Sequence, residues 1–466
     1  MPPPPGASVR RAAPNRRSWA ARQGGLLAVA LVAVVVASGP LTATSLRAAD
    51  EGSPALELRA GDRIVLVGNT FAERMIEFGH FEALLSTLLP EHQLTFRNLA
   101  WSADELTRQR FYTPETPYKV DIPGWNSGES MFQPRPLNFG DIYTHLHAQR
   151  ADVILCCFGM NESFRGEPGL VKFADDLRSL VDSLASLQFN GHSAPRLVLV
   201  SPIPHEPLEG LPDPAAHNEQ LAAYTAAIET VAAEKSLPVV NLFAALAPLM
   251  ESGAGDPLTF NGIHQTAYGD WVAALEMARQ LGLLDGEVPR VEIDAARLEG
   301  TASGAHLGEL TRAGSGLTFE VSGLSTPLPP PPVGARLHPQ LVLPLPVLAI
   351  RGLPPGEYAL QVGQQQVLRA TSGEWSQGVR VPAIAAGERA EAVRQACIAK
   401  NRQFFYRWRA VNGEYIYGRR KEPFGVVNFP QEMELLDQIV AEGDAHIHAL
   451  AAEPQPKYLQ VIGTDP

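Results

Sequence analysis

The feature that most constrains the fold is a series of short, continuous apolar segments separated by helical patterns. Such segments, rich in β-branched residues, lie between residues 50 and 286: "RIVLVG", "LTFRNLA", "DVILCCFG", "RLVLVSPIP" and "LPVVNLF". Strands that are apolar without alternation are covered on both faces, as in a parallel sheet with helices on each side. The sequence therefore predicts an α/β domain over residues 50–286, with a parallel sheet between helical layers.

Helical patterns connect these segments. They cover residues 72–89, 171–187, 215–235 and 267–281. In parallel α/β sheets, ligands bind beyond the carboxyl ends of the strands. We therefore expect the functional residues to follow the apolar segments directly.

The rest of the chain changes in character. Residues 287–385 are rich in glycine and proline and contain short β-like pieces such as "GLTFEVSG" and "GEYALQV", which predict a small β module. Residues 386–466 predict a helical tail, with an aromatic and arginine-rich stretch, "FFYRWRAVNGEYIYGRR", that we interpret as packing the tail on the core through arginine stacked on aromatic rings. The β module either interrupts the first domain or follows it, because the last helix can pack back on the sheet.

The amino terminus has the order of an export signal. Arginines between Arg10 and Arg22 precede the apolar segment "LLAVALVAVVVAS", which ends at Gly39-Pro40. This segment is shorter than the ~20 residues of a membrane-spanning helix. We expect residues 1–49 to be a cleaved leader, without stable membrane insertion unless it stays uncleaved, and the protein to be periplasmic or extracellular. The pair Arg16-Arg17 resembles a twin-arginine signal.

Composition excludes some classes of partner. The 50 acidic and 38 basic residues give a formal charge of −12, and the predicted folded region has no basic patch of the kind that binds nucleic acid. Three cysteines do not form a disulfide scaffold, and Cys156 and Cys157 lie within an apolar segment, as buried residues on opposite faces of a strand do. We expect no cofactor and no metal.

Four short blocks fall where the predicted sheet brings them together. "GNT" (68–70), "NLAWSAD" (98–104) and "GMNE" (159–162) follow the first three apolar segments, and "NGIHQTAYG" (261–269) leads into the last helix of the domain. Their order and content resemble the SGNH or GDSL hydrolase superfamily. This resemblance implies a flavodoxin-like α/β/α sandwich and a secreted esterase or lipase.

The resemblance also implies a set of site residues. Thr70 occupies the position of the nucleophilic serine, His264 that of the base and Asn261 that of the aspartate that orients the base. The backbone N–H of Ala103 and the side chain of Asn161 occupy the positions of oxyanion donors. The implied substrates are small-molecule or polysaccharide esters, such as acetyl groups.

Two of these positions depart from the family pattern. Thr70 adds a methyl group at Cβ, which stiffens the side chain and crowds the path of attack. Asn261 cannot stabilise an imidazolium by charge, and the same loss costs about 10⁴-fold in turnover in a serine protease. The expectation is either slow ester hydrolysis or a degenerate site that binds a glycan or a partner protein in the same cleft. A third reading makes the domain a scaffold for envelope assembly by the β module and tail.

Other readings of single residues stay open at this level. Thr70 can serve simply as the N-cap of a helix that begins near Phe71. Ser102 offers a second hydroxyl beside Ala103. Asp256 could supply the missing carboxylate, although "GAGDP" is equally typical of a turn.

The connection over residues 104–150 is much longer than an ordinary crossover, and such connections often form lids or binding loops. Its aromatic side chains either stack on sugar rings or fix the loop to the domain surface. They are Phe111, Tyr112, Tyr118, Trp125, Phe132 and Tyr143.

Overall fold

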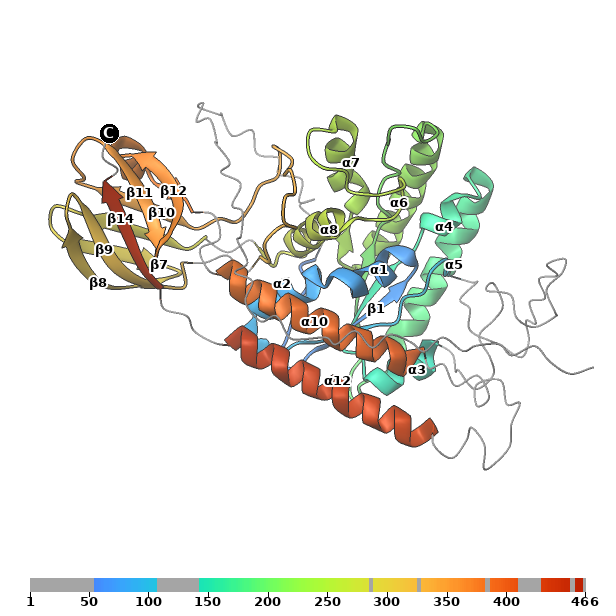
Figure 1. Ribbon diagram of the computed structural model, residues 1–466. Coiled ribbons are helices and arrows are strands. Elements are labelled where there is room, and N and C mark those ends of the chain that lie inside the picture. Colours follow the sequence, from blue (N-terminus) through green and yellow to red (C-terminus); the bar gives the residue numbers. More distant parts are fainter. Residues whose placement is uncertain are drawn as a thin grey trace, which may run out of the picture. The chain divides into compact units, whose positions relative to one another are not determined.

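The computed structural model describes seven stretches of the chain (Figure 1). The leader predicted over residues 1–49 lies outside them, as does the 104–150 connection between residues 107 and 141, with all of its aromatic residues named above except Tyr143. The described stretches are 54–106, 142–284, 288–324, 328–381, 386–409, 429–452 and 457–463.

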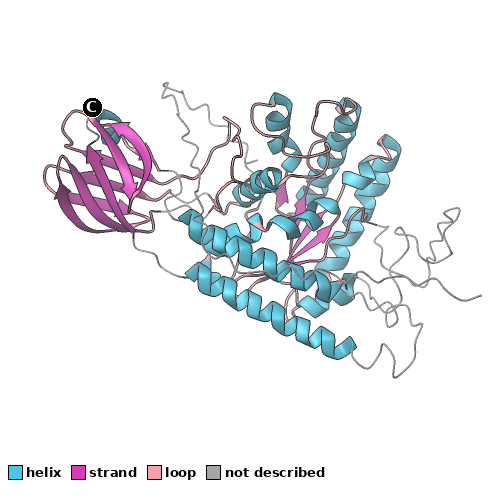
Figure 2. Cartoon of the chain, in the orientation of Figure 1, coloured by secondary structure: helices cyan, strands magenta, loops and turns pink. Residues whose placement is uncertain are grey.

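The first domain is built on a parallel sheet, enclosed by helices as Figure 2 shows. Its strands lie in the order β2-β1-β3-β4-β5, and every neighbouring pair is parallel. The bounds are β1 Arg63–Gly68, β2 Thr95–Asn98, β3 Val153–Cys157, β4 Arg196–Val200 and β5 Val239–Val240. This order is that of a flavodoxin-like sheet, in which successive strands are added first on one side of β1 and then on the other, so that the topological switch point lies between β1 and β3. The predicted fold class is confirmed.

Each face of the sheet packs on its own helices, because successive strand residues point to opposite sides. Ile64 and Leu66 join a cluster with α1 (Thr70–Phe78), α2 (His80–Leu88), α7 (Leu242–Ser252) and α8 (Ala267–Gln280). Val65 and Val67 join a cluster with α3 (Ile142–Gln149), α5 (Glu167–Ala185) and α6 (Ala215–Lys235). Tyr143 packs against this second cluster.

Cys156 and Cys157 follow the same alternation, and both are buried free thiols. Burial raises the pKa of Cys156 to about 12, so its thiol is inert at neutral pH. The prediction of two small buried residues on opposite faces holds.

The single helix predicted over residues 72–89 is in fact two helices. Gly79 adopts a left-handed conformation, with φ of +67°, and its N–H donates to Met75 O at 3.0 Å. A glycine in this conformation ends a helix, and α2 begins at the next residue. The apolar pattern continues across Gly79, so it does not reveal the break.

The β module contains two sheets around one core. Their strand orders are β13-β10-β6-β7 and β12-β11-β14-β9-β8, and both contribute to a cluster that contains Val291, Phe319, Ile350, Trp375 and Leu459. The bounds are β6 Arg290–Asp294, β7 Glu299–Ser303, β8 His306–Ala313, β9 Gly316–Ser322, β10 Val347–Arg351, β11 Glu357–Val362, β12 Gln365–Thr371, α9 Ser372–Gln377, β13 Val379–Arg380 and β14 Lys457–Gly463.

The tail belongs to both parts of the chain. Its helices α10 (Ala386–Trp408) and α12 (Phe429–Ala452) contact α2, and α10 also contacts α1 and β2. The last strand, β14, lies between β9 and β11 of the β module. The β module therefore interrupts the first domain, and the tail, predicted as helical, ends in a strand that completes the module.

The tail helices cover the edge strand β2. Lys400 Nζ donates to Phe96 O at 3.0 Å, and His448 Nε2 is 2.8 Å from Leu94 O. These carbonyls belong to alternate residues and point away from β1, so side chains replace the missing next strand. The buried Lys400 ammonium also pairs with Glu82 at 2.7 Å.

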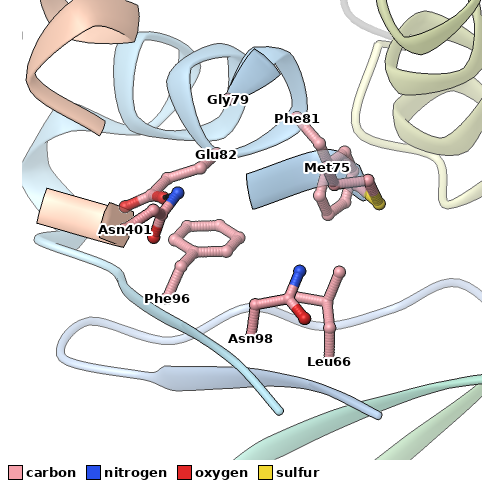
Figure 3. Close-up of a pocket in the computed structure, with 8 residues that line it drawn as sticks. All are labelled: Leu66, Met75, Gly79, Phe81, Glu82, Phe96, Asn98 and Asn401. Carbon is pink, nitrogen blue, oxygen red and sulfur yellow. Dashed lines mark hydrogen bonds between the residues drawn. The ribbon is translucent and has the colours of Figure 1, made fainter. Parts of the chain in front are cut away.

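A small cavity adjoins this contact (Figure 3). None of the candidate site residues lines it. Its lining comes from β1, α1, α2, β2 and α10, namely Leu66, Met75, Gly79, Phe81, Glu82, Phe96, Asn98 and Asn401. Across the described residues, no helix combines the length and apolar character needed to span a bilayer.

Candidate functional site

The turn after β1 places Thr70 at the start of a helix. Gly68 has φ of +140°, and a Cβ there would lie 2.1 Å from Cys157 O, so only glycine fits. Asn69 is the N-cap of α1, because its Oδ1 accepts the N–H of Phe71 at 3.2 Å. The reading in which Thr70 caps the helix is therefore wrong, and the capping role belongs to its neighbour.

The Thr70 hydroxyl has a different partner. Its Oγ1 accepts the backbone N–H of Ala103 at 3.2 Å. Ala103 ends the loop after β2, and Trp101 N donates to Gly68 O at 2.9 Å to hold that loop against β1. An oxyanion formed by attack of Thr70 would lie beside the same N–H.

Ala103 has a backbone conformation that favours glycine, with φ of +61°. Alanine in the left-handed region costs about 1 kcal/mol. The neighbouring Ser102 is exposed and donates to the carboxylate of Glu73, which also pairs with Arg409 at 2.7 Å. The Ser102 hydroxyl, considered above as a second candidate nucleophile, is thus bound to a carboxylate that is already ion-paired.

The base loop, defined here as residues 257–266, places Asn261 beside His264. Asn261 Oδ1 accepts the backbone N–H of His264 at 3.0 Å and that of Ile263 at 3.4 Å. These two bonds fix which end of the amide is oxygen. Its Nδ2 therefore faces the imidazole and lies 2.9 Å from His264 Nδ1.

This contact selects the tautomer of His264. An amide N–H donates to Nδ1, so Nδ1 is the acceptor and the ring proton lies on Nε2. Nε2 then donates a hydrogen bond and cannot take a proton. Aspartate at position 261 would accept from Nδ1–H and leave the lone pair of Nε2 free.

The surroundings of His264 keep it neutral. Burial and the nearby guanidinium of Arg74 lower the pKa of His264. Phe260 stacks on the imidazole with ring centroids 5.7 Å apart, and Arg74 lies 5.0 Å from the centroid of the Phe260 ring. Phe260 is 57% exposed, so much of its ring is accessible to solvent.

The base loop is joined directly to α1. Gln265 Nε2 donates to Phe71 O at 3.0 Å, and Arg74 Nε donates to Gln265 O at 3.3 Å. These bonds bring the Asn261–His264 pair to the helix that begins with Thr70. Asp256 faces elsewhere, since its carboxylate accepts the N–H of Arg336 at 2.9 Å. The structure therefore does not support Asp256 as the carboxylate that orients His264.

A buried carboxylate holds the base loop from the other side. Glu206 accepts the N–H of Leu258 at 2.9 Å, the N–H of Thr259 at 2.6 Å and the Thr259 hydroxyl at 2.5 Å. Its own N–H donates to Gly262 O at 2.8 Å. Sequence reasoning missed Glu206, although it follows the fourth apolar segment, where functional residues are expected.

Asn161 lies in α4 (Met160–Ser163), the short helix after β3, and is half-buried. The next residue, Glu162, accepts the N–H of Gly159 and that of Leu106, each at 3.0 Å. Burial raises the pKa of Glu162 to about 7. Glu162 thus links the turn that contains Asn161 to Leu106, which lies at the beginning of the long connection.

A second serine and histidine pair also lies near the base loop. Ser163 Oγ donates to Met160 O at 2.7 Å, so the contact at 2.9 Å from His217 Nε2 is a donation by the imidazole. His217 Nδ1 then accepts from His205 Nδ1 at 3.0 Å. Ser163 is fully buried and its proton is already used, so this pair is not an activated nucleophile.

Comparison with known proteins matches part of the first domain to one family. Residues 92–272 match the model of the GDSL-like lipase/acylhydrolase family. The first domain of the chain belongs to the SGNH/GDSL hydrolase superfamily. The matched range contains Ala103, Asn161, Asn261 and His264, whereas Thr70 precedes it. No curated protein sequence matches the chain.

The chain is also similar to solved structures. A gut microbial diltiazem-metabolizing enzyme is 14% identical, with a TM-score of 0.65 over 89% of this chain and 100% of that chain. An acetylxylan esterase from Geobacillus stearothermophilus is 16% identical, with a TM-score of 0.34 over 49% of this chain and 97% of that chain. A putative GDSL-like lipase from Parabacteroides merdae is 14% identical, with a TM-score of 0.37 over 49% of this chain and 100% of that chain.

Proposed function

We propose that the protein is an exported ester hydrolase that acts on acetyl or other ester groups of polysaccharides or small molecules, with an altered triad that limits its turnover. The observation that carries the proposal is the Ala103 N–H, which donates to Thr70 Oγ1 at 3.2 Å. An N–H this close to the hydroxyl is within reach of the oxyanion that attack by that hydroxyl would create. The match of residues 92–272 to the GDSL-like lipase/acylhydrolase family supports the same class of reaction.

The proposed reaction begins with attack of Thr70 Oγ1 on the ester carbonyl carbon. The carbonyl oxygen takes the electron pair as an oxyanion, held by the Ala103 N–H and the side-chain amide of Asn161. The alcohol then leaves, and water hydrolyses the acyl-threonine. The proton from Thr70 must pass to His264, which first has to lose its contact with Asn261 Nδ2 and move its ring proton to Nδ1. This step accounts for the slow turnover.

An aryl acetate assay on the purified protein tests the proposal. We expect Thr70→Ala and His264→Ala to reduce hydrolysis to the uncatalysed rate. Thr230→Ala is the matched control, because Thr230 is an exposed threonine whose hydroxyl bonds only within α6. Equal rates in the wild type and all three variants would reject ester hydrolysis.

One observation favours a second function, the binding of a glycan in the same cleft. The Nε2–H of His264 and the exposed ring of Phe260 suit a sugar hydroxyl and a sugar face. Binding of acetylated oligosaccharides without release of acetate, lost in Phe260→Ala, would support this alternative over hydrolysis.

A further inference from the structure

A side chain from the tail contacts the loop of the candidate oxyanion donor. Arg409 directly follows α10, and its N–H donates to Phe405 O at 2.8 Å. Its guanidinium lies 3.8 Å from the centroid of the Trp101 ring. Trp101 stands two residues before Ala103. Figure 1 shows α10 beside α1 and α2, far from them in sequence.

The same guanidinium binds two further groups around the loop. It donates through one terminal nitrogen to Ala100 O at 2.7 Å and pairs through the other with Glu73 at 2.7 Å. Glu73 is three residues after Thr70 on α1 and accepts from Ser102. Arg409 therefore joins the helix of the nucleophile to the loop of the donor.

The loop requires such support. Ala103 is held with a φ of +61°, and strained backbone persists only where the surroundings fix it. The side chain of Arg409 is only 13% exposed, so its contacts are shielded from solvent. A planar guanidinium can stack on an indole and bond in its own plane at the same time, whereas a lysine ammonium cannot.

We propose that Arg409 is a positioning residue for the oxyanion donor. It fixes residues 100–103 against α1 and so directs the Ala103 N–H toward Thr70. The catalytic consequence rests on the proposed function, but the ordering of the loop does not. The tail is then part of the site, because Arg409 lies outside the SGNH/GDSL domain.

Hydrogen–deuterium exchange on the full chain tests the ordering. Arg409→Lys keeps the charge and Arg409→Ala removes it. Arg407→Ala is the matched control, because Arg407 lies in the last turn of α10, two residues before Arg409, and pairs instead with Asp437 at 2.7 Å. We expect amides of residues 99–104 to exchange at least about tenfold faster in both Arg409 variants and at the wild-type rate in the control. Unchanged exchange in Arg409→Lys would overturn the proposal, even if Arg409→Ala does not fold.

The activity arm separates this proposal from the proposed function. On an aryl acetate, we expect Arg409→Lys to lower kcat about tenfold with little change in KM, because the donor acts in the transition state. A change in KM with kcat unchanged would overturn the positioning role. A wild type that hydrolyses no ester rejects the proposed function alone, since the exchange experiment still decides whether Arg409 orders the loop.

Discussion

At the scale of single residues, the amide of Asn261 decides what His264 can do. Its Nδ2 donates to His264 Nδ1 and leaves the proton on Nε2. We expect Asn261→Asp to raise kcat on an aryl acetate by at least about 10²-fold, because aspartate reverses the tautomer and stabilises the imidazolium. Steady-state kinetics check this increase.

The matched control is the double variant Thr70→Ala with Asn261→Asp. If Thr70 is the nucleophile, removing its hydroxyl abolishes the gain. A gain that persists in the double variant would instead mean that water or another group attacks the ester. No gain in Asn261→Asp alone would contradict the tautomer argument.

Ala103 provides a second residue-scale prediction. Glycine adopts φ of +61° without strain, so Ala103→Gly should leave stability unchanged or raise it by up to about 1 kcal/mol, after the greater entropy of unfolded glycine is included. Urea unfolding measures this. Ala100→Gly is the control, since Ala100 is buried without a positive φ and its substitution should destabilise the chain. Equal losses in the two variants would contradict the assigned strain.

At the scale of elements, Glu206 determines the shape of the base loop. Glu206 accepts hydrogen bonds from three donors through its two carboxylate oxygens. In glutamine an amino group replaces one of these oxygens, so at least one buried donor is left without a partner. We expect Glu206→Gln to cost about 1–3 kcal/mol of unfolding free energy and to lower kcat. Thermal unfolding and the aryl acetate assay measure the two effects.

Glu209→Gln is the control for this element, because Glu209 is exposed in the same connection after β4. It should match the wild type in both measurements. Wild-type stability in Glu206→Gln would show that the loop does not depend on the carboxylate.

At the scale of the whole molecule, the chain leaves the SGNH/GDSL domain, builds most of the β module, returns through α10 and α12, and ends in the module as β14. Val461 on β14 is fully buried between β9 and β11. We expect Val461→Asp to unfold the β module, because a charge without a partner enters its core. Limited proteolysis should then cleave within residues 288–324 and 328–381 and leave residues 54–106 and 142–284 protected.

Gln460→Asp is the control, since Gln460 is exposed on the same strand. Its digestion pattern should equal that of the wild type. Protection of residues 288–381 in Val461→Asp would mean that the module holds without β14.

The sequence predicted the parallel sheet and its helices because buried strands and amphipathic helices leave periodic apolar patterns. The strand segments, the helix over 215–235 and the four family blocks depend on such local patterns or short motifs. The break at Gly79 does not, because a left-handed glycine leaves the apolar pattern intact.

The sequence by itself thus determined the fold class of the first domain, and it predicted which residues form the site. Only the tertiary structure decided how they meet. The Asn69 cap of α1 and the amino group that Asn261 turns to His264 are short-range contacts that the apolar pattern does not show. Glu206 and Arg409 hold the base loop and the loop after β2 through contacts between distant segments. The course of the tail has the same cause, because residues that are far apart in sequence bury the edge of β2 and fill the gap between β9 and β11.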